Sequence, residues 1–284
     1  MSQLPTPVPF HAMFATLAGF PWYGWTFAAS LIGILYWAKL VSARVEARPS
    51  AEDLSNRAFP VEPGVRTNAA EVRDLAIGAP LSSTWSFPIN TIRTRATPDE
   101  MREILLDAWG VSTPEAARDT LRWLLDEGHR EAFDAVLHTA GEEPSQTPPR
   151  TLYAQVGPGA AAGLAEPWGH YLATHGALRS RGFLQSEADL ERGTAAWDWS
   201  RTVTVARFAL SAELLDEAEA WTYVREAGRR SRETFGSWEE FLRSYVIGRA
   251  VWNGMAQLDD PGITQMIENV RSAPDSPWQM VAWS

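Results

Sequence analysis

Apolar residues follow one another without a charge over the first part of the chain. Residues 20–38 read FPWYGWTFAASLIGILYWA, and residues 1–38 contain no Asp, Glu, Lys or Arg. At about 1.5 Å per residue this run is long enough to cross a bilayer once as a helix. Aromatic residues stand at both of its ends, as they do at membrane interfaces. The pattern predicts a membrane anchor over residues 1–44, with a transmembrane helix at about residues 20–38.

The charges beside the apolar run predict its orientation. Lys39, Arg44 and Arg48 follow it against only Glu46, and an excess of positive charge marks the cytoplasmic flank of a span. We therefore expect a single-pass protein of the inner membrane with its C-terminal part in the cytoplasm. Two alternatives remain open. A buried helix of a soluble protein is also apolar all round, and a cleavable signal peptide is apolar too, although its charges precede the apolar run.

A segment without any sustained apolar period comes next. Residues 45–66 mix charges with Pro49, Pro60 and Pro63, a composition typical of a linker. We expect a tether over 45–66 and a globular body over 67–284.

Start and stop signals for helices are dense in this body. Thr97 precedes Pro98 and Glu100, which predicts a capped helix over 98–109 that ends at Gly110. A second helix is expected to start at Thr113-Pro114 and to run until Gly128, because its apolar residues recur at steps of three and four.

Two further helices are predicted after Asp216 and after Ser237, and Ser237 with Glu240 forms the pattern of a capping box. Their short connection predicts that they pack against each other as an antiparallel hairpin. Residues 141–167 are rich in Gly, Pro, Ser and Thr, so we expect a loop insertion there. The fold class predicted is all-α: a globular helical domain with one N-terminal transmembrane helix.

Charge and composition exclude several classes of function. The net charge is -10, and the first 48 residues hold three basic and one acidic residue, so the remainder carries about -12. A broad phosphate-neutralising face needs a local excess of cations, so we expect no nucleic acid as partner. The chain has no cysteine, which excludes disulfides, thiol nucleophiles and Cys-ligated metals. His170 and His175 are five residues apart, which splays them on a helix, and we expect neither a metal ion nor a cofactor.

One cluster is a candidate for chemistry or binding. Asp198 and Arg201 are one helical turn apart and can pair, and Trp197 can stack on the guanidinium of Arg201. The pair is either a buried structural ion pair or part of a site. If the protein is an enzyme, His129 and Glu240 join Asp198 and Arg201 as catalytic candidates, with a carboxylate, an imidazole and a guanidinium as base, acid and anion clamp.

A second set is a candidate for contact with a partner, because aromatic and arginine side chains anchor interfaces. Its members are Trp197, Arg201, Trp238 and Arg249.

Several motifs, taken in order, resemble the bacterial domain-of-unknown-function family numbered 1266. They are WGV at 109–111, WLLDEGHR at 123–130, AWDWSR at 196–201, EAEAW at 217–221, SWEEF at 237–241, GR at 248–249 and SPWQ at 276–279 with Trp283. The resemblance covers about residues 105–284, so the expected anchor lies outside it. It implies a bacterial, mainly helical domain and no established activity or catalytic residue.

Three functions of different classes follow from these observations. The first is a membrane-tethered, helical protein-binding domain, for instance a regulatory or immunity-type protein. The second is an enzyme with a polar site around Asp198, Arg201 and His129, and the third is a structural membrane domain. A convergent polar pocket with His129 and Asp198 favours the enzyme, and a broad acidic or aromatic patch favours the binding protein.

Overall fold

The computed structural model describes residues 58–66, 68–141, 144–155 and 163–284. Every regular element in these ranges is a helix, which confirms the predicted all-α body. None of these helices combines the length and the hydropathy needed to cross a membrane. The expected anchor over 1–44 lies outside the described residues.

The helices of the described ranges are α4 (Ala69–Ala76), α5 (Ala79–Trp85), α6 (Pro98–Trp109), α7 (Pro114–Asp126), α8 (Arg130–Ala140), α9 (Arg150–Tyr153), α11 (Ala165–Ser180), α12 (Glu187–Arg192), α13 (Ala195–Ser211), α14 (Glu217–Thr234), α15 (Trp238–Asn253), α16 (Met255–Leu258), α17 (Pro261–Ser272) and α18 (Pro277–Met280).

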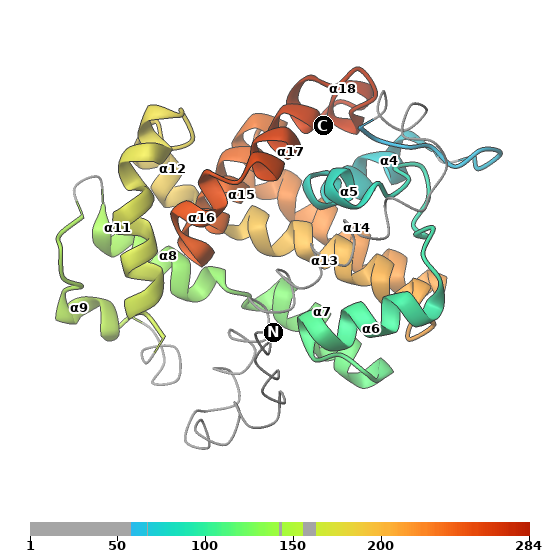
Figure 1. The fold of residues 1–284 in the computed structure, drawn as a ribbon, viewed down its shortest axis with the longest axis horizontal. Coiled ribbons are helices and arrows are strands. Elements are labelled where there is room, and N and C mark those ends of the chain that lie inside the picture. The colour runs from blue at the N-terminus through green and yellow to red at the C-terminus, as the bar shows by residue number, and fades with distance from the viewer. Residues whose placement is uncertain (1–57, 67, 142–143, 156–162) are drawn as a thin grey trace, which may run out of the picture.

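Helix α13 is the centre of the fold. It is buried from its first residue to Leu210, although it contains Asp198, Arg201 and Arg207. Helices α5, α6, α7, α8, α14 and α15 pack around it. Figure 1 shows α13 crossing the middle of the molecule, with α6 and α7 near one end and α8, α9, α11 and α12 at the other. The polar side chains of α13 therefore have to find partners inside the protein.

The helices begin at the predicted cap residues. The hydroxyl of Thr97 accepts a hydrogen bond from the backbone N–H of Glu100, and Gly110 ends α6 with a φ of 64°. Thr113 caps α7 in the same way, and the carboxylate of Asp216 caps α14. Local signals are enough to predict these helix starts, because a cap residue and the N–H group that it binds are only a few residues apart.

The predicted hairpin of α14 and α15 is wrong. Each of the two helices packs along α13, and they form no extended interface with each other in the described chain. The connection itself explains the difference. Phe235 has extended backbone, is buried, and contacts the rings of Trp199 on α13 and Phe241 on α15. The apolar sides of both helices thus face the central helix.

The beginning of the described chain packs against its end. Phe59 is fully buried, and its N–H donates to Asp275 at 3.0 Å. The indole N–H of Trp278 donates to the carbonyl of Ala76 at 2.8 Å. The folded body therefore already includes Phe59, which lies within the range expected for the tether (45–66).

The segment expected as a loop insertion, 141–167, contains packed structure. Helix α9 lies within it and buries Leu152, and Leu164 is also fully buried just before α11 begins. Its residues 142–143 and 156–162 lie outside the described part of the chain. Leu152 and Leu164 thus bury apolar surface in a segment whose Gly- and Pro-rich composition predicts a loop.

Candidate functional site

Asp198 reaches from the first turn of α13 to the start of α8. Its Oδ1 accepts from the backbone N–H of His129 at 3.2 Å, and its Oδ2 accepts from the N–H of Arg130 at 2.9 Å. Helix α8 has no capping side chain of its own. Asp198 therefore supplies the missing cap from another helix, and its negative charge faces the positive end of the α8 dipole.

Gly128 makes this contact possible. Its φ is +64°, a left-handed conformation that L side chains rarely adopt, and a Cβ built on it would lie 2.0 Å from Oδ2 of Asp198. Only glycine allows the backbone of the turn to come this close to the carboxylate.

Arg201 completes the cluster. Its guanidinium pairs with Oδ1 of Asp198, and its Nη2 donates to Nδ1 of His129 at 2.8 Å. The pKa of His129 is well below its usual value, mainly because the side chain is buried and also because the positive charge of Arg201 is close to it. His129 is therefore neutral at pH 7, and the nitrogen that would take up a proton accepts a hydrogen bond from Arg201 instead.

A second carboxylate, that of Asp134, binds the start of α13. Oδ1 of Asp134, on α8, accepts from the N–H and from the hydroxyl of Thr194 at 2.7 and 2.8 Å, where α13 begins. Burial raises the pKa of Asp134 to about 6, and the charge of Asp198 adds to this rise. Asp134 could not be singled out from the sequence, because its partner Thr194 is sixty residues away.

Three of the four predicted binding residues lie together. The guanidinium of Arg201 stacks on Trp197 and Trp109, with its Cζ 4.5 and 5.5 Å from the ring centroids. Arg249 of α15 lies over the same Trp197, at 5.5 Å. Trp197 is thus stacked with two guanidinium groups, which joins α6, α13 and α15.

Glu240 and Trp238 lie elsewhere. Glu240 accepts from Arg192 at 3.3 Å and from the N–H of Gly236 at 2.7 Å, so it helps to fix the start of α15. Trp238 stacks on Trp278 with the ring centroids 5.1 Å apart. The structure brings Asp198, Arg201 and His129 together but leaves Glu240 and Trp238 out.

The carboxylate of Asp198 is closed to solvent, and the side chains around it are mostly buried. The side chain of Asp198 is 0% exposed, that of Arg201 is 8% exposed and that of His129 is 15% exposed. Both oxygens of Asp198 and Nδ1 of His129 have protein partners. The arrangement holds helices together, and its reactive atoms are engaged in doing so.

Arg207 is a further buried cation of α13. Its guanidinium donates to the hydroxyl of Ser82 at 2.9 Å, and to the carbonyls of Pro88 and Ile92 at 2.6 and 3.2 Å. Burial lowers the pKa of Arg207 to about 9, so the group stays charged at neutral pH. Arg207 thereby fixes the segment between α5 and α6, and the pattern of the sequence did not reveal this role.

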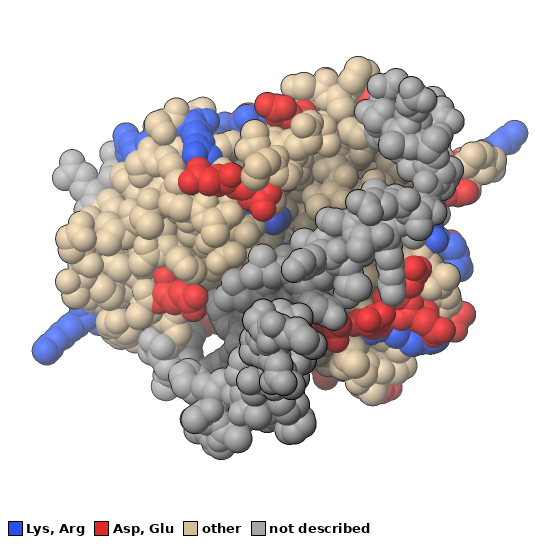
Figure 2. Space-filling model, viewed as in Figure 1, with Lys and Arg blue, Asp and Glu red and all other residues tan. Residues whose placement is uncertain are grey.

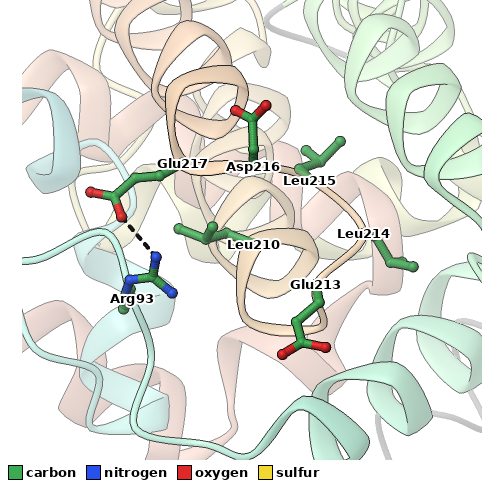
Figure 3. Close-up of a pocket in the computed structure, with 7 residues that line it drawn as sticks. All are labelled: Arg93, Leu210, Glu213, Leu214, Leu215, Asp216 and Glu217. Carbon is green, nitrogen blue, oxygen red and sulfur yellow. Dashed lines mark hydrogen bonds and ion pairs between the residues drawn. The ribbon is translucent and has the colours of Figure 1, made fainter.

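A hollow of about 390 Å³ lies where α13 turns into α14. Figure 3 shows Glu217 next to Arg93 on one side of Leu210, and Glu213 on the other side. Glu217 pairs with Arg93 at 2.8 Å, Glu213 pairs with Arg102 at 2.9 Å, and Asp216 caps α14. Each of these carboxylates therefore already has a partner, which is an arginine for Glu213 and Glu217 and the start of α14 for Asp216.

The exposed surface has no broad aromatic patch in the described residues. The large apolar side chains that are exposed are scattered: Val61, Val65, Leu106, Tyr153 and Met280. Figure 2 shows acidic side chains next to basic ones at the end of the molecule where α6 and α7 lie. There, Asp99 pairs with Arg102 and Asp119 pairs with Arg122, so the acidic residues alternate with arginines.

The histidines in the described ranges do not converge on a metal site. Nδ1 of His170 lies 3.1 Å from the carbonyl of Val251, and the ring of His175 packs on Tyr171. No group of three side chains able to hold a metal ion occurs among the described residues.

The fold and the cluster define a helical domain built around one buried helix whose polar side chains connect its neighbours. The chain belongs to the DUF1266 family of proteins of unknown function, whose family model matches residues 104–283. Neither a curated protein nor a solved structure matches the chain. Helices α4 and α5 precede the matched range, yet they pack against α17 and α18 within it.

Proposed function

We propose that the protein is a membrane-tethered, helical protein-binding domain of a bacterium, with a regulatory or immunity-type role. Residues 20–38 serve as a single transmembrane helix of the inner membrane, and the helical body lies in the cytoplasm. The partner is a protein that the body meets at the inner face of the membrane.

The observation that carries this proposal is the closed state of the polar cluster. Asp198 is fully buried and holds the start of α8, and the acceptor nitrogen of His129 is occupied by Arg201. A general base has to reach the proton that it removes. The residues that would carry out catalysis are thus used for structure, which favours binding by the surface over the enzyme as an alternative.

The membrane part of the proposal is tested by cell fractionation and by proteolysis. A C-terminal epitope tag should be found in the membrane fraction, and protease added to intact spheroplasts should leave the body uncut. As a control, replacing Lys39, Arg44 and Arg48 by Glu should disturb the orientation, because the positive flank is then lost. Recovery of the full-length protein in the soluble fraction would overturn the anchor.

The binding part is tested by affinity purification from detergent-solubilised cells, with mass spectrometry of the proteins that co-elute. The same chain without residues 20–38 is the control, since a partner at the membrane should be enriched only with the anchored chain. Equal enrichment with both chains would show that partner binding does not depend on the membrane anchor, and this part of the proposal would be wrong. The lack of any enriched protein after crosslinking in intact cells would overturn the binding role.

A further inference from the structure

A second hollow lies between the end of α11 and the helices α16 and α17, and it has a volume of about 450 Å³. This volume falls within the range of pockets that bind small groups, roughly 300–1,000 Å³. The side chains that line the hollow come from three parts of the chain: Arg181, Phe183, Leu258, Asp259, Thr264, Ile267, Glu268 and Arg271.

The apolar part of this lining consists of three side chains. Phe183 and Leu258 are buried, and Ile267 is half-buried and packs against the core. The guanidinium of Arg271 lies over the ring of Phe183, with its Cζ 5.2 Å from the ring centroid. A side chain that enters the hollow from solvent therefore meets both apolar surface and charge.

Both arginines of the lining already have a carboxylate. Nη2 of Arg181 donates to Oδ1 of Asp259 at 2.6 Å, and Nε of Arg271 donates to Oε2 of Glu239, on α15, at 3.0 Å. Nη1 of Arg181 also donates to the carbonyl of Leu258. An anion in the hollow would thus compete with carboxylates that are already bound to these guanidinium groups.

Glu268 is the exception among the charged residues of the lining. It is exposed, and its carboxylate has no hydrogen bond and no ion pair with any residue that the structure describes. Once Arg181 is paired with Asp259 and Arg271 with Glu239, the charge left over in the hollow is negative. Apolar surface beside an unpaired carboxylate is complementary to a cation on an apolar stem, which is the composition of lysine and arginine side chains.

We propose that the second hollow binds a lysine or arginine side chain of the protein partner. The methylene groups of that side chain would lie against Phe183, Leu258 and Ile267, and its charge would lie next to Glu268. This inference rests on the proposed protein-binding function and adds the chemistry by which the partner is recognised. Membrane proteins carry an excess of lysine and arginine on their cytoplasmic flanks, so a partner at the inner face of the membrane would present such side chains.

Selection of peptides on the purified protein tests the hollow. Random seven-residue peptides displayed on phage are selected on the full-length chain in mild detergent. We expect the enriched sequences to contain a lysine or arginine beside an apolar residue. A fluorescently labelled synthetic copy of the most enriched peptide is then titrated against variants of the chain, and binding is measured by fluorescence anisotropy.

Three variants separate the hollow from the negative charge of the whole chain. Glu268→Lys should weaken peptide binding about tenfold, because like charges then meet in the hollow. Glu268→Gln keeps the shape and removes only the charge, so its loss should be smaller. Glu103→Lys is the matched control: Glu103 is an exposed glutamate of α6 without a hydrogen bond or ion pair in the described ranges, and its replacement changes the net charge equally. This control should bind the peptide within about twofold of the wild type.

Three results would overturn the inference: enrichment of acidic peptides, no enrichment of any peptide, or basic peptides that bind Glu268→Lys as tightly as the wild type. The melting temperature of each variant shows that it is folded. Failure of the proposed function is a separate result, because the purification of a partner from cells does not use these peptides. A partner that co-purifies equally with the wild type and with Glu268→Lys would leave the binding role in place and show that the hollow does not recognise it.

Discussion

Asp134 and Asp198 cap the N-termini of each other's helices. Asp134 lies on α8 and accepts from Thr194 at the start of α13, and Asp198 lies on α13 and accepts from the N–H groups of His129 and Arg130 at the start of α8. Each carboxylate faces the positive end of the other helix. The two contacts together fix the position of α8 along α13.

Asp198→Ala should destabilise the protein by about 3–5 kcal/mol. The change leaves the buried guanidinium of Arg201 without its carboxylate, and it removes the cap of α8. Chemical unfolding followed by tryptophan fluorescence measures the loss.

The double variant Asp198→Ala with Arg201→Met is the control. Its loss should be smaller than the sum of the two single losses, because the uncompensated charge disappears together with its partner. Unchanged stability of Asp198→Ala, together with loss of a co-purifying partner, would instead identify Asp198 and Arg201 as part of a functional site.

Gly128→Ala should cost about 3 kcal/mol, and Gly110→Ala should cost about 1 kcal/mol. Both glycines have a φ of +64°, but a Cβ on Gly110 meets nothing within 4 Å, whereas one on Gly128 would collide with Asp198. The two variants share the backbone strain. They differ in the collision with Asp198 and in an approach of 2.8 Å to Nη1 of Arg130, which is the end of a flexible side chain and can move away. In the background of Asp198→Ala the two costs should become similar. Equal costs in the wild-type background would contradict the close contact between Gly128 and Asp198.

The ends of several helices could be predicted because their signals are local. Thr97 with Glu100, and Asp216 with the first turn of α14, lie within four residues of the backbone groups that they cap. The pairing of Asp198 with Arg201 was likewise predictable from their separation of three residues, and it is present.

The partners that lie far apart in sequence could not be predicted. Nothing near Asp198 indicates that it caps a helix that starts 68 residues earlier. The predicted hairpin of α14 and α15 failed for the same reason. A short connection indicates that two helices are neighbours in sequence, but it does not show that a third helix, α13, packs between their apolar faces.

Arg207→Met should destabilise the protein by about 3 kcal/mol, since it leaves several buried carbonyl oxygens without a donor. Hydrogen exchange of residues 86–93 should also become faster, because Arg207 holds this segment through Pro88, Thr91 and Ile92. Unfolding and exchange measurements check the two effects.

Arg229→Met is the matched control for Arg207. Arg229 has two ion pairs, with Glu226 and Glu233, but its side chain is 53% exposed. Ion pairs in water contribute little, so this variant should unfold at nearly the same denaturant concentration as the wild type. A larger loss at Arg229 than at Arg207 would contradict the structural role of the buried guanidinium.

The charge of Asp134 should make the protein less stable as the pH rises from 4 to 7. Burial, with a further contribution from the charge of Asp198, raises the pKa of Asp134 from 3.8 to about 6, and the hydrogen bonds from Thr194 only partly oppose this rise. The native state therefore binds a proton more tightly than the unfolded chain does. The resulting stabilisation is fully present below about pH 4 and is lost as the pH rises through 6, by about 3 kcal/mol.

Asp134→Asn isolates this effect, because asparagine keeps an oxygen for Thr194 but has no charge to titrate. We expect the variant to be more stable than the wild type at pH 7, and the difference in unfolding free energy to shrink as the pH falls towards 4. Groups such as Asp74, whose pKa is raised by burial, and Asp189, whose pKa is lowered, are present in both chains. Their contributions cancel in the difference between the two chains. A difference that stays constant from pH 4 to 8 would show that the pKa of Asp134 is the same in the native and unfolded states. The contact of the Asp134 carboxylate with Thr194 would then carry no electrostatic cost.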